Sequence, residues 1–334
     1  MSKKIDCTTR ILTNTDVSKI LTFDLVIKAV EEAFKLYSMN KVQLAPVVSL
    51  EIKNADGEVD IKSGYDQENE LIGTKIASGY WHNPKNYSLP SSLATIVLQS
   101  GQNGVPLAII EASAITNMRT GAAGAISAKY LARSDSKKIA VLGTGTQAMM
   151  QILALEEIFD MEVVKVWGRN PERASEYINT MKLKSTATFM KSETPKSCIE
   201  DADIIITTTG SKVPLIQKDW VRAGTHIICI GADMEGKQEI DEQLFEDTKV
   251  VVDSLAQCSK RGELQHAIQK QVIVDIDVYA ELGEIILGNK VGRESLSEIT
   301  IFDATGLSIQ DISVAKEVLK SAYKQNIGFC LPFI

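Results

Sequence analysis

The chain has 334 residues, of which 44% are hydrophobic and 24% are charged, and its formal net charge is −7 at pH 7. This composition is typical of a globular protein, and the length predicts about two domains. The acidic balance disfavours nucleic acid as a partner, because phosphate binding needs a basic surface. No run approaches the ~20 apolar residues of a membrane span, and the N-terminus lacks a signal peptide's apolar core, so we expect a cytoplasmic protein with no membrane contact.

Residues that could form disulfides or hold metals are sparse. The three histidines show no metal-ligand spacing, so no metal site is expected. The cysteines form no CxxC pair and mostly have apolar neighbours, which favours buried free thiols at Cys7, Cys198, Cys229, Cys258 and Cys330.

The first 111 residues predict an α+β region. An amphipathic helix is expected over residues 16–39, with Asp16 as its N-cap. Residues 54–57 and 101–104 are typical hairpin turns, so the sheet should be largely antiparallel. The alternating runs predict its strands at residues 47–52, 59–63, 71–77, 94–98 and 107–111.

From residue 112 onward, helices and strands alternate. This pattern predicts an α/β fold with a doubly wound, mostly parallel sheet, and an amphipathic helix over residues 309–325 follows it. The expected strands are residues 138–142, 163–167, 187–190, 204–208, 226–230, 250–252 and 299–301, and the expected helices are residues 112–132, 146–158, 171–181 and 196–199.

The strongest local motif follows the first of these strands. It is the G-x-G-x-x-A string Gly143-Thr144-Gly145-Thr146-Gln147-Ala148, which opens a helix. The first glycine permits a tight turn, the second admits a pyrophosphate, and the free N–H groups of the helix start attract phosphate. We therefore predict a Rossmann dinucleotide-binding domain. The alternative is a tight turn without a ligand.

The tip of the second strand usually determines which cofactor is bound, because a carboxylate there bonds the ribose of NAD. This chain has Arg169 and Asn170 at that place, with Arg173 nearby. Arg169 could hold the 2′-phosphate of NADP, so NAD(P) binding is expected with NADP slightly favoured. Alternatively, Arg169 stacks on the adenine or faces solvent.

Five strings in order resemble the ornithine cyclodeaminase and mu-crystallin family, over nearly the whole chain. They are residues 75–79 with 83–84 and 89–92, residues 118–124, 143–148 and 231–239, and residues 303–306 with 310–311. The branches most similar in appearance are the ectoine-utilisation cyclodeaminases, iminosuccinate reductase and archaeal-type alanine dehydrogenase.

The resemblance implies a homodimer with two domains in each chain. Residues 1–118 with 309–334 would form a discontinuous α+β domain for dimerisation and substrate binding, and residues 119–308 would form the Rossmann domain.

The resemblance also implies roles for single residues. Arg119 takes the position that binds the substrate carboxylate, which suits its planar, two-donor guanidinium group. Lys75 matches a lysine that contacts the same carboxylate, and with Asp233 it would be catalytic. Thr305 matches a substrate-pocket position. The matching cofactor positions are Ser91, Arg119, Thr120, Gly143, Thr144, Gly145, Thr146, Gln147, Thr208, Gly231, Lys237 and Ala304, beside Arg169 and Asn170.

Two positions depart from the family pattern. Family members often carry an arginine early in the first domain, and this chain has none from residue 11 to 118. The place of a glutamate that receives the distal amine of ornithine falls on Lys62. A lysine there would repel an ammonium group and attract a carboxylate. The alternative is that Lys62 points away from the pocket.

Together, these observations predict an enzyme that reduces a small imino acid with NAD(P)H or, in reverse, oxidatively deaminates an L-amino acid. Alanine dehydrogenase and iminosuccinate reductase are the models for this activity. The alternatives are an ornithine cyclodeaminase, and a mu-crystallin-like protein that binds NADPH and a small ligand without turnover. The presence of both Lys75 and Asp233 favours an enzyme.

Overall fold

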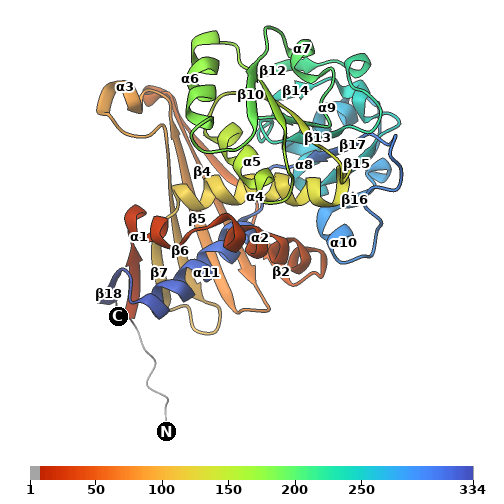
Figure 1. Cartoon of the computed structure of the whole chain (residues 1–334). Coiled ribbons are helices and arrows are strands. Elements are labelled where there is room, and N and C mark those ends of the chain that lie inside the picture. The colour runs from red at the N-terminus through yellow and green to blue at the C-terminus, as the bar shows by residue number, and fades with distance from the viewer. Residues whose placement is uncertain (1–7, 334) are drawn as a thin grey trace. The chain divides into compact units, whose positions relative to one another are not determined.

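The computed structural model describes residues 8–333, and the chain forms two compact units (Figure 1). One unit comprises Met1–Arg119 and Leu307–Ile334, and the other is Thr120–Gly306. The boundaries therefore lie at residues 119 and 306, where the sequence led us to expect 118 and 308. The first boundary falls inside helix α4 (Ser113–Leu131), and the second directly precedes helix α11 (Ser308–Gln325).

The first unit is built on one mixed sheet with strand order β18-β1-β7-β6-β5-β4-β2, and β3 also pairs with β4. Every neighbouring pair is antiparallel except β1 with β7, so the largely antiparallel sheet is confirmed. The strands are β1 (Thr8–Leu12), β2 (Val42–Leu44), β3 (Val48–Ile52), β4 (Gly57–Asp66), β5 (Leu71–Tyr80), β6 (Ser92–Ser100), β7 (Pro106–Glu111) and β18 (Phe329–Pro332).

The expected helix over residues 16–39 is in fact two helices, α1 (Asn14–Ile20) and α2 (Phe23–Ser38). The prediction that Asp16 is an N-cap is wrong. Thr13 caps α1, and the Asp16 carboxylate completes a capping box by accepting from the Thr13 N–H at 3.1 Å. A second threonine, Thr22, accepts from the Leu25 N–H at 3.2 Å and starts α2.

Two glycines of the sheet allow helix α11 to lie close to it. Gly64 of β4 and Gly73 of β5 are direct partners across the sheet. A Cβ atom on Gly64 would lie 2.7 Å from Ser308 Oγ, and one on Gly73 would overlap the Ile312 side chain. Ser308 Oγ also donates to the Ser63 carbonyl at 3.0 Å. This close packing fixes the first turns of α11 against β4 and β5. Helix α2 packs alongside α11, and α3 (Asn83–Tyr87) lies between β5 and β6 in the chain (Figure 1).

The second unit confirms the predicted doubly wound α/β fold. Its main sheet has the order β10-β9-β8-β11-β13-β17-β15-β16, and all neighbours are parallel. The strands are β8 (Lys138–Leu142), β9 (Val163–Trp167), β10 (Thr188–Lys191), β11 (Ile204–Thr207), β13 (His226–Cys229), β15 (Lys249–Val252), β16 (Ala280–Glu281) and β17 (Thr300–Asp303).

Helices and a small separate strand pair complete the second unit. The central strands β11, β13 and β17 are buried along their whole length, as expected for a parallel sheet with both faces covered. The helices are α5 (Thr146–Glu156), α6 (Pro171–Met181), α7 (Pro195–Ile199), α8 (Leu255–Arg261), α9 (Leu264–Gln269) and α10 (Leu282–Ile286), and the strand pair is β12 (Lys212–Ile216) with β14 (Gln238–Ile240).

The expectation of buried free thiols holds at three of four described cysteines. Cys198, Cys229 and Cys258 are free and buried, whereas Cys330 is exposed because it lies on the edge strand β18. Cys7 lies outside the described residues. None of the helices within residues 8–333 is both long enough and apolar enough to cross a membrane. The same residues contain no group of three or more His, Cys, Asp or Glu placed to hold a metal ion.

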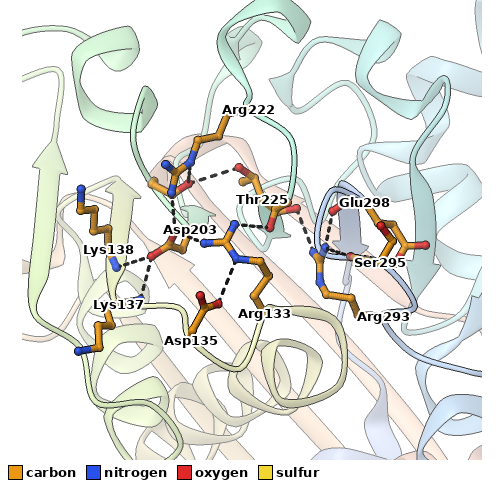
Figure 2. A network of polar contacts seen from close by, with 12 residues as sticks. Arg133, Asp135, Lys137, Lys138, Asp203, Arg222, Thr225, Arg293, Ser295 and Glu298 are labelled. Atoms are coloured by element: carbon orange, nitrogen blue, oxygen red, sulfur yellow. Dashed lines mark hydrogen bonds and ion pairs between the residues drawn. The ribbon is translucent and has the colours of Figure 1, made fainter.

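A polar network joins the amino-terminal ends of the central strands, and Asp203 is its centre (Figure 2). One carboxylate oxygen accepts from the backbone N–H groups of Lys137 and Lys138 at 2.8 and 2.9 Å. The other bonds the guanidinium groups of Arg133 and Arg222. Because Asp203 is 5% exposed, these four donors tie the starts of β8, β11 and β13 together inside the second unit.

Replacing Asp203 should therefore destabilise the protein. We expect Asp203→Asn to lower the free energy of unfolding by about 2–3 kcal/mol at pH 7, because an amide cannot accept from all four donors. Burial alone would raise the pKa of Asp203, but the N–H groups of Lys137 and Lys138 and the charge of Arg133 lower it below 3.8. The stabilisation is thus present above pH 3.8 and is lost as the pH falls through the folded-state pKa.

Urea unfolding at pH 7 and pH 3 measures this effect. The difference in the free energy of unfolding between Asp203→Asn and the wild type should be smaller at pH 3 than at pH 7. Asp135→Asn is the control, because Asp135 also pairs with Arg133 but its side chain is 74% exposed. It should change stability by less than about 0.5 kcal/mol. Equal losses for the two variants would contradict the central place of Asp203.

Candidate active site

Three of the predicted substrate residues lie together in the first unit. Lys62 of β4 and Lys75 of β5 are direct partners across the sheet, so their side chains share one face. That face is the one covered by α11, and Arg119 reaches the same place from α4. All three are buried, with exposed fractions of 8% for Lys62, 3% for Lys75 and 7% for Arg119.

A carboxylate that we did not assign from the sequence joins two of these cations. Lys75 Nζ donates to Asp311 Oδ1 at 3.0 Å and lies 2.8 Å from Oδ2. Arg119 Nε donates to the same Oδ1 at 3.1 Å, and its Nη1 donates to Gln310 Oε1 at 3.1 Å. The sequence pattern could have indicated that Asp311 is buried. Asp311 lies on the same face of α11 as the apolar residues Ala315, Val318 and Ala322, at helical spacing.

Burial and mutual charge set the protonation of this cluster. Burial lowers the pKa of Lys75 to about 7; the Asp311 carboxylate opposes this, and the charges of Arg119 and Lys62 add to it. Burial alone would raise the pKa of Asp311, but Lys75 and Arg119 hold it below its usual range. Lys75 and Arg119 thus share one buried carboxylate, with Lys62 close by, and ammonium and guanidinium groups held in this way suit an anionic ligand.

The glycine motif of the second unit has the geometry of a phosphate-binding turn. Gly143 has φ +124°, and a Cβ atom there would overlap Thr208 Oγ1, so only glycine fits. Gly145 is the N-cap of α5 and gives it no side-chain cap. A Cβ atom on Gly145 would meet no atom within 4 Å. The first turn of α5 thus has no cap from its N-cap side chain and has open space beside Gly145.

The tip of β9 differs in part from the expectation. The Asn170 side chain accepts from the Arg173 N–H at 2.9 Å and caps α6, so its oxygen already has a structural partner. Arg169 forms no ion pair with any other residue of the described chain, and a ligand could engage its guanidinium. A Cβ atom on Gly168 would lie 2.7 Å from Thr144 Cγ2, so this tip packs against the glycine turn.

The remaining predicted residues of the second unit follow neighbouring strands. Thr208 follows β11, Gly231 and Asp233 follow β13, and Ala304 and Thr305 follow β17. Because β8, β11, β13 and β17 are adjacent and parallel, these residues gather at one edge of the sheet with the glycine turn. This edge is where open α/β sheets bind their ligands.

Asp233 and Lys237 form an ion pair at this edge. Lys237 Nζ lies 2.7 Å from Asp233 Oδ1, and the Asp233 side chain is 49% exposed. Arg261 Nε donates to the Asp233 carbonyl at 3.1 Å, which fixes the backbone of the loop. The backbone of Thr305 is fixed by Asp253, because the Thr305 N–H donates to Asp253 Oδ2 at 3.0 Å. The edge thus presents an accessible carboxylate beside a cation.

Glu239 is a second carboxylate that the sequence analysis did not assign, and it joins two loops at this edge. It accepts from the Gly231 N–H at 3.0 Å and from the Thr209 N–H, so it joins the loops that follow β11 and β13. A Cβ atom on Gly231 would overlap its carboxylate. Burial raises the pKa of Glu239 to about 7, and its bonds with Thr209 oppose the rise.

Ser91 and Thr120 occupy other positions in the fold. Ser91 precedes β6, five residues before Ile96, which is the strand partner of Lys75. Five extended residues span about 17 Å, so Ser91 lies far along the sheet from the cation cluster. The Thr120 carbonyl accepts from Gln151 Nε2 at 2.8 Å, a contact between α4 and α5.

Comparison with known proteins gives one family match and several close relatives. A model of the "Ornithine cyclodeaminase/mu-crystallin family" matches residues 7–326. An archaeal alanine dehydrogenase dimer with bound NAD has a similar structure, with a TM-score of 0.91 and 39% identity, over 98% of this chain and 100% of that one.

Two further relatives are reductases. The structure of Thermococcus litoralis Δ1-pyrroline-2-carboxylate reductase with NADH and L-proline gives a TM-score of 0.91 at 33% identity, over 96% of this chain and 99% of that one. The iminosuccinate reductase of Paracoccus denitrificans is 32% identical over 313 residues, which is 94% of this chain and 96% of that protein.

The open space at Gly145 allows a test of dinucleotide binding that leaves the fold intact. Gly145 has φ −92° and ψ −174°, which a valine can adopt, and its missing Cβ has no close neighbour. We expect Gly145→Val to weaken NADH binding at least about tenfold, because the side chain blocks the approach to the α5 N–H groups. A fluorescence titration with NADH measures the affinity.

The melting temperature of the same variant is the control, and it should stay within about 2 °C of the wild type because surface substitutions that break no contact cost little. An unchanged NADH affinity would show that the dinucleotide does not pass over this turn.

Proposed function

The chain belongs to the ornithine cyclodeaminase/mu-crystallin family, and from this premise we propose that it reduces a small imino acid with a nicotinamide cofactor and, in reverse, oxidatively deaminates an L-amino acid. The family match confirms the resemblance drawn from the sequence motifs. Relatives over nearly the whole chain are named as dehydrogenases and reductases, which supports an oxidoreductase. The observation that carries the proposal is the buried cation cluster of Lys62, Lys75 and Arg119 around Asp311. We place the activity in the cytoplasm.

We assign binding of the substrate's α-carboxylate to Arg119 and Lys75. Asp311 and Gln310 hold the Nε and Nη1 atoms of Arg119, and Nη2 takes no part in these contacts. A guanidinium fixed on two sides loses little entropy when it binds a carboxylate with its remaining donors. The bound carboxylate would also complete the pairing of Lys75 and Arg119, which share Asp311.

We assign proton transfer at the substrate nitrogen to Asp233. Its carboxylate is accessible at the ligand-binding edge, and Lys237 at 2.7 Å orients it. A general acid–base at this place would complement hydride transfer, which the nicotinamide ring supplies when it is bound. The cofactor would be held by the glycine turn Gly143–Thr146 and by Gly231, with Thr208 and Ala304 beside them.

For the side chain of the substrate, we propose that Lys62 favours a second carboxylate. It is buried on the same face as Lys75, so a distal ammonium of ornithine would meet a like charge at low solvent exposure. This disfavours the ornithine cyclodeaminase alternative. A substrate with an acidic side chain gains an attraction instead, and a small neutral side chain avoids the repulsion.

Some observations favour NAD(H) as the cofactor and others favour NADP(H). Structures of relatives contain NAD or NADH, whereas the tip of β9 carries Arg169 and no carboxylate. We propose that the chain accepts NADPH at least as well as NADH, through Arg169. Asn170 contributes less than the sequence led us to expect, because its oxygen caps α6.

An assay with purified protein tests the proposed function. Ammonia, NADH or NADPH and a 2-oxo acid should give cofactor oxidation at 340 nm with pyruvate or oxaloacetate. We expect Lys62→Met to lower kcat/KM for oxaloacetate about tenfold and to leave pyruvate within about threefold, because only the former has a second carboxylate. Arg119→Met is the positive control and should impair both substrates.

Other results would support a different member of the family. Proline and ammonia formed from ornithine without net cofactor turnover would establish a cyclodeaminase. Tight NADPH binding with no turnover of pyruvate, oxaloacetate or Δ1-pyrroline-2-carboxylate would establish a mu-crystallin-like binding protein.

We also propose that the protein is a homodimer. The two copies would meet through the face of the first unit's sheet that lies opposite to helix α11. Val48 and Leu50 of β3, Ile76 of β5 and Leu93 of β6 are all at least 40% exposed. Leu50 and Leu93 lie in one cross-strand row through Val59 and Ser78, and Val48 and Ile76 lie in the next row on that face. Exposed apolar side chains gathered on one sheet face are typical of an interface, and the similar alanine dehydrogenase is described as a dimer; both observations support this proposal.

Charge on this face should separate the two copies. We expect Leu50→Glu to shift the protein from dimer to monomer in analytical ultracentrifugation, because a C2 contact would bury the new carboxylate twice. Leu296→Glu is the matched control: Leu296 is 76% exposed in the second unit and should leave the dimer unchanged. A Leu50→Glu protein that stays dimeric would rule out this face as the interface.

A further inference from the structure

Asp311 is the acid shared by the two cations to which we assign the substrate carboxylate. It is 1% exposed and lies in the first turns of α11, which the Gly64–Gly73 pair allows to approach the sheet. Its oxygens lie 2.8 and 3.0 Å from Lys75 Nζ, and one of them accepts from Arg119 Nε at 3.1 Å. One carboxylate therefore fixes an ammonium and a guanidinium that come from two different elements.

The groups around Lys75 show what depends on this carboxylate. Lys62 faces it from β4, Arg119 from α4 and Asp311 from α11, while its strand partner on β6 is the apolar Ile96. Two of the three polar neighbours are cations and one is an anion. The charged form of Lys75 is therefore stabilised by Asp311, whereas the positive charges of Lys62 and Arg119 both destabilise it.

We propose that Asp311 is a positioning residue of the substrate site, which holds Lys75 and Arg119 in place and keeps the Lys75 ammonium charged so that it can bind a carboxylate. The inference rests on the proposed function only where it names the substrate's α-carboxylate as the ligand. In this role Asp311 acts through Lys75 and Arg119, against which its carboxylate lies.

The energetic reason is the burial of Lys75. Burial lowers the pKa of Lys75 to about 7, and Asp311 is the largest influence in the opposite direction. Without this carboxylate, the pKa of Lys75 would fall further and the side chain would be neutral at physiological pH. A neutral amine contributes little to carboxylate binding.

The neighbouring residue supports a ligand at this place. Gln310 is fully buried; its Oε1 accepts from Arg119 Nη1 at 3.1 Å and from the Leu307 N–H at 3.3 Å. Its Nε2 is buried without a hydrogen-bond partner in the described chain. A buried donor beside Arg119 is costly when it is left unsatisfied, and an anion bound there could accept from it.

Binding of pyruvate across a pH series tests the proposal. Calorimetry uses the full-length chain saturated with NAD and without ammonia, between pH 5.5 and 9. In the wild type, the Kd should rise about tenfold per pH unit once Lys75 loses its proton. In Asp311→Asn, the rise should begin about one pH unit lower, while the Kd at pH 5.5 stays within about fivefold of the wild type.

Asp66→Asn is the matched control. Asp66 is a fully buried carboxylate of the same unit, and it bonds the N–H and the amide of Asn69. This variant should leave the pH midpoint unchanged even if it melts at a lower temperature. A midpoint that does not move in Asp311→Asn, or a loss of affinity that is equal at every pH, would overturn the role of Asp311.

A second measurement separates this role from the proposed function. If pyruvate binds neither protein at any pH, the proposed substrate site fails, and melting temperatures of Asp311→Asn, Lys75→Met and the double variant still test the pairing. We expect Lys75→Met to lower the melting temperature by about 2 °C less in the Asp311→Asn background than in the wild type. In that background the substitution removes a buried cation that has lost its carboxylate partner. Additive changes would show that Asp311 does not act on Lys75.

Discussion

The site of the first unit depends on one buried carboxylate that is shared by cations from different parts of the chain. Asp311 lies 236 residues from Lys75 and 192 from Arg119, and the three meet only because the last helix returns to the sheet built by the first part of the chain. The Gly64–Gly73 pair makes this return close enough for direct contact. Lys75 and Arg119 share this single carboxylate, so the anionic substrate that we propose could accept from the donors that remain. If the proposed substrate binds here, stability and affinity depend on the same charges.

In the second unit, the two ends of the sheet serve different purposes. The amino-terminal ends of β8, β11 and β13 are joined by Asp203, whose four donors leave it no capacity for a ligand. The carboxyl-terminal ends carry the glycine turn and the accessible carboxylate of Asp233. The backbone also approaches other groups closely at this end, where Gly143 and Gly231 leave no room for a side chain. The strong polar network thus supports the sheet at the end away from the predicted cofactor.

Sequence patterns were sufficient for the long, periodic elements and failed where a distant contact decides. Seven parallel strands between β8 and β17 and the glycine turn followed from the sequence pattern, because most of these strands are short apolar runs between turns. The short strands β12, β14 and β16 were not predicted. The break between α1 and α2 was missed, since two threonine caps interrupt a stripe that is otherwise continuous. Asp311 and Glu239 were not assigned roles, because their partners are fixed by packing. Asn170 shows the opposite error: a polar side chain at a strand tip suggested a ligand but caps a helix.

The alternation of β4 connects the two proposals made for the first unit. Ile61 and Lys62 are neighbours in sequence, so they face opposite sides of the sheet. Ile61 lies in the cross-strand row of Val48 and Ile76 on the apolar face, and Lys62 lies opposite Lys75 beneath α11. A shift of one residue in strand register would place the lysine in the apolar face and the isoleucine beside Asp311. The register is set by the long β4–β5 pairing, which runs without interruption from Gly57 to Asp66. The proposed dimer face and the proposed substrate-binding face are therefore both set by the β4–β5 pairing, and a change of register would alter both.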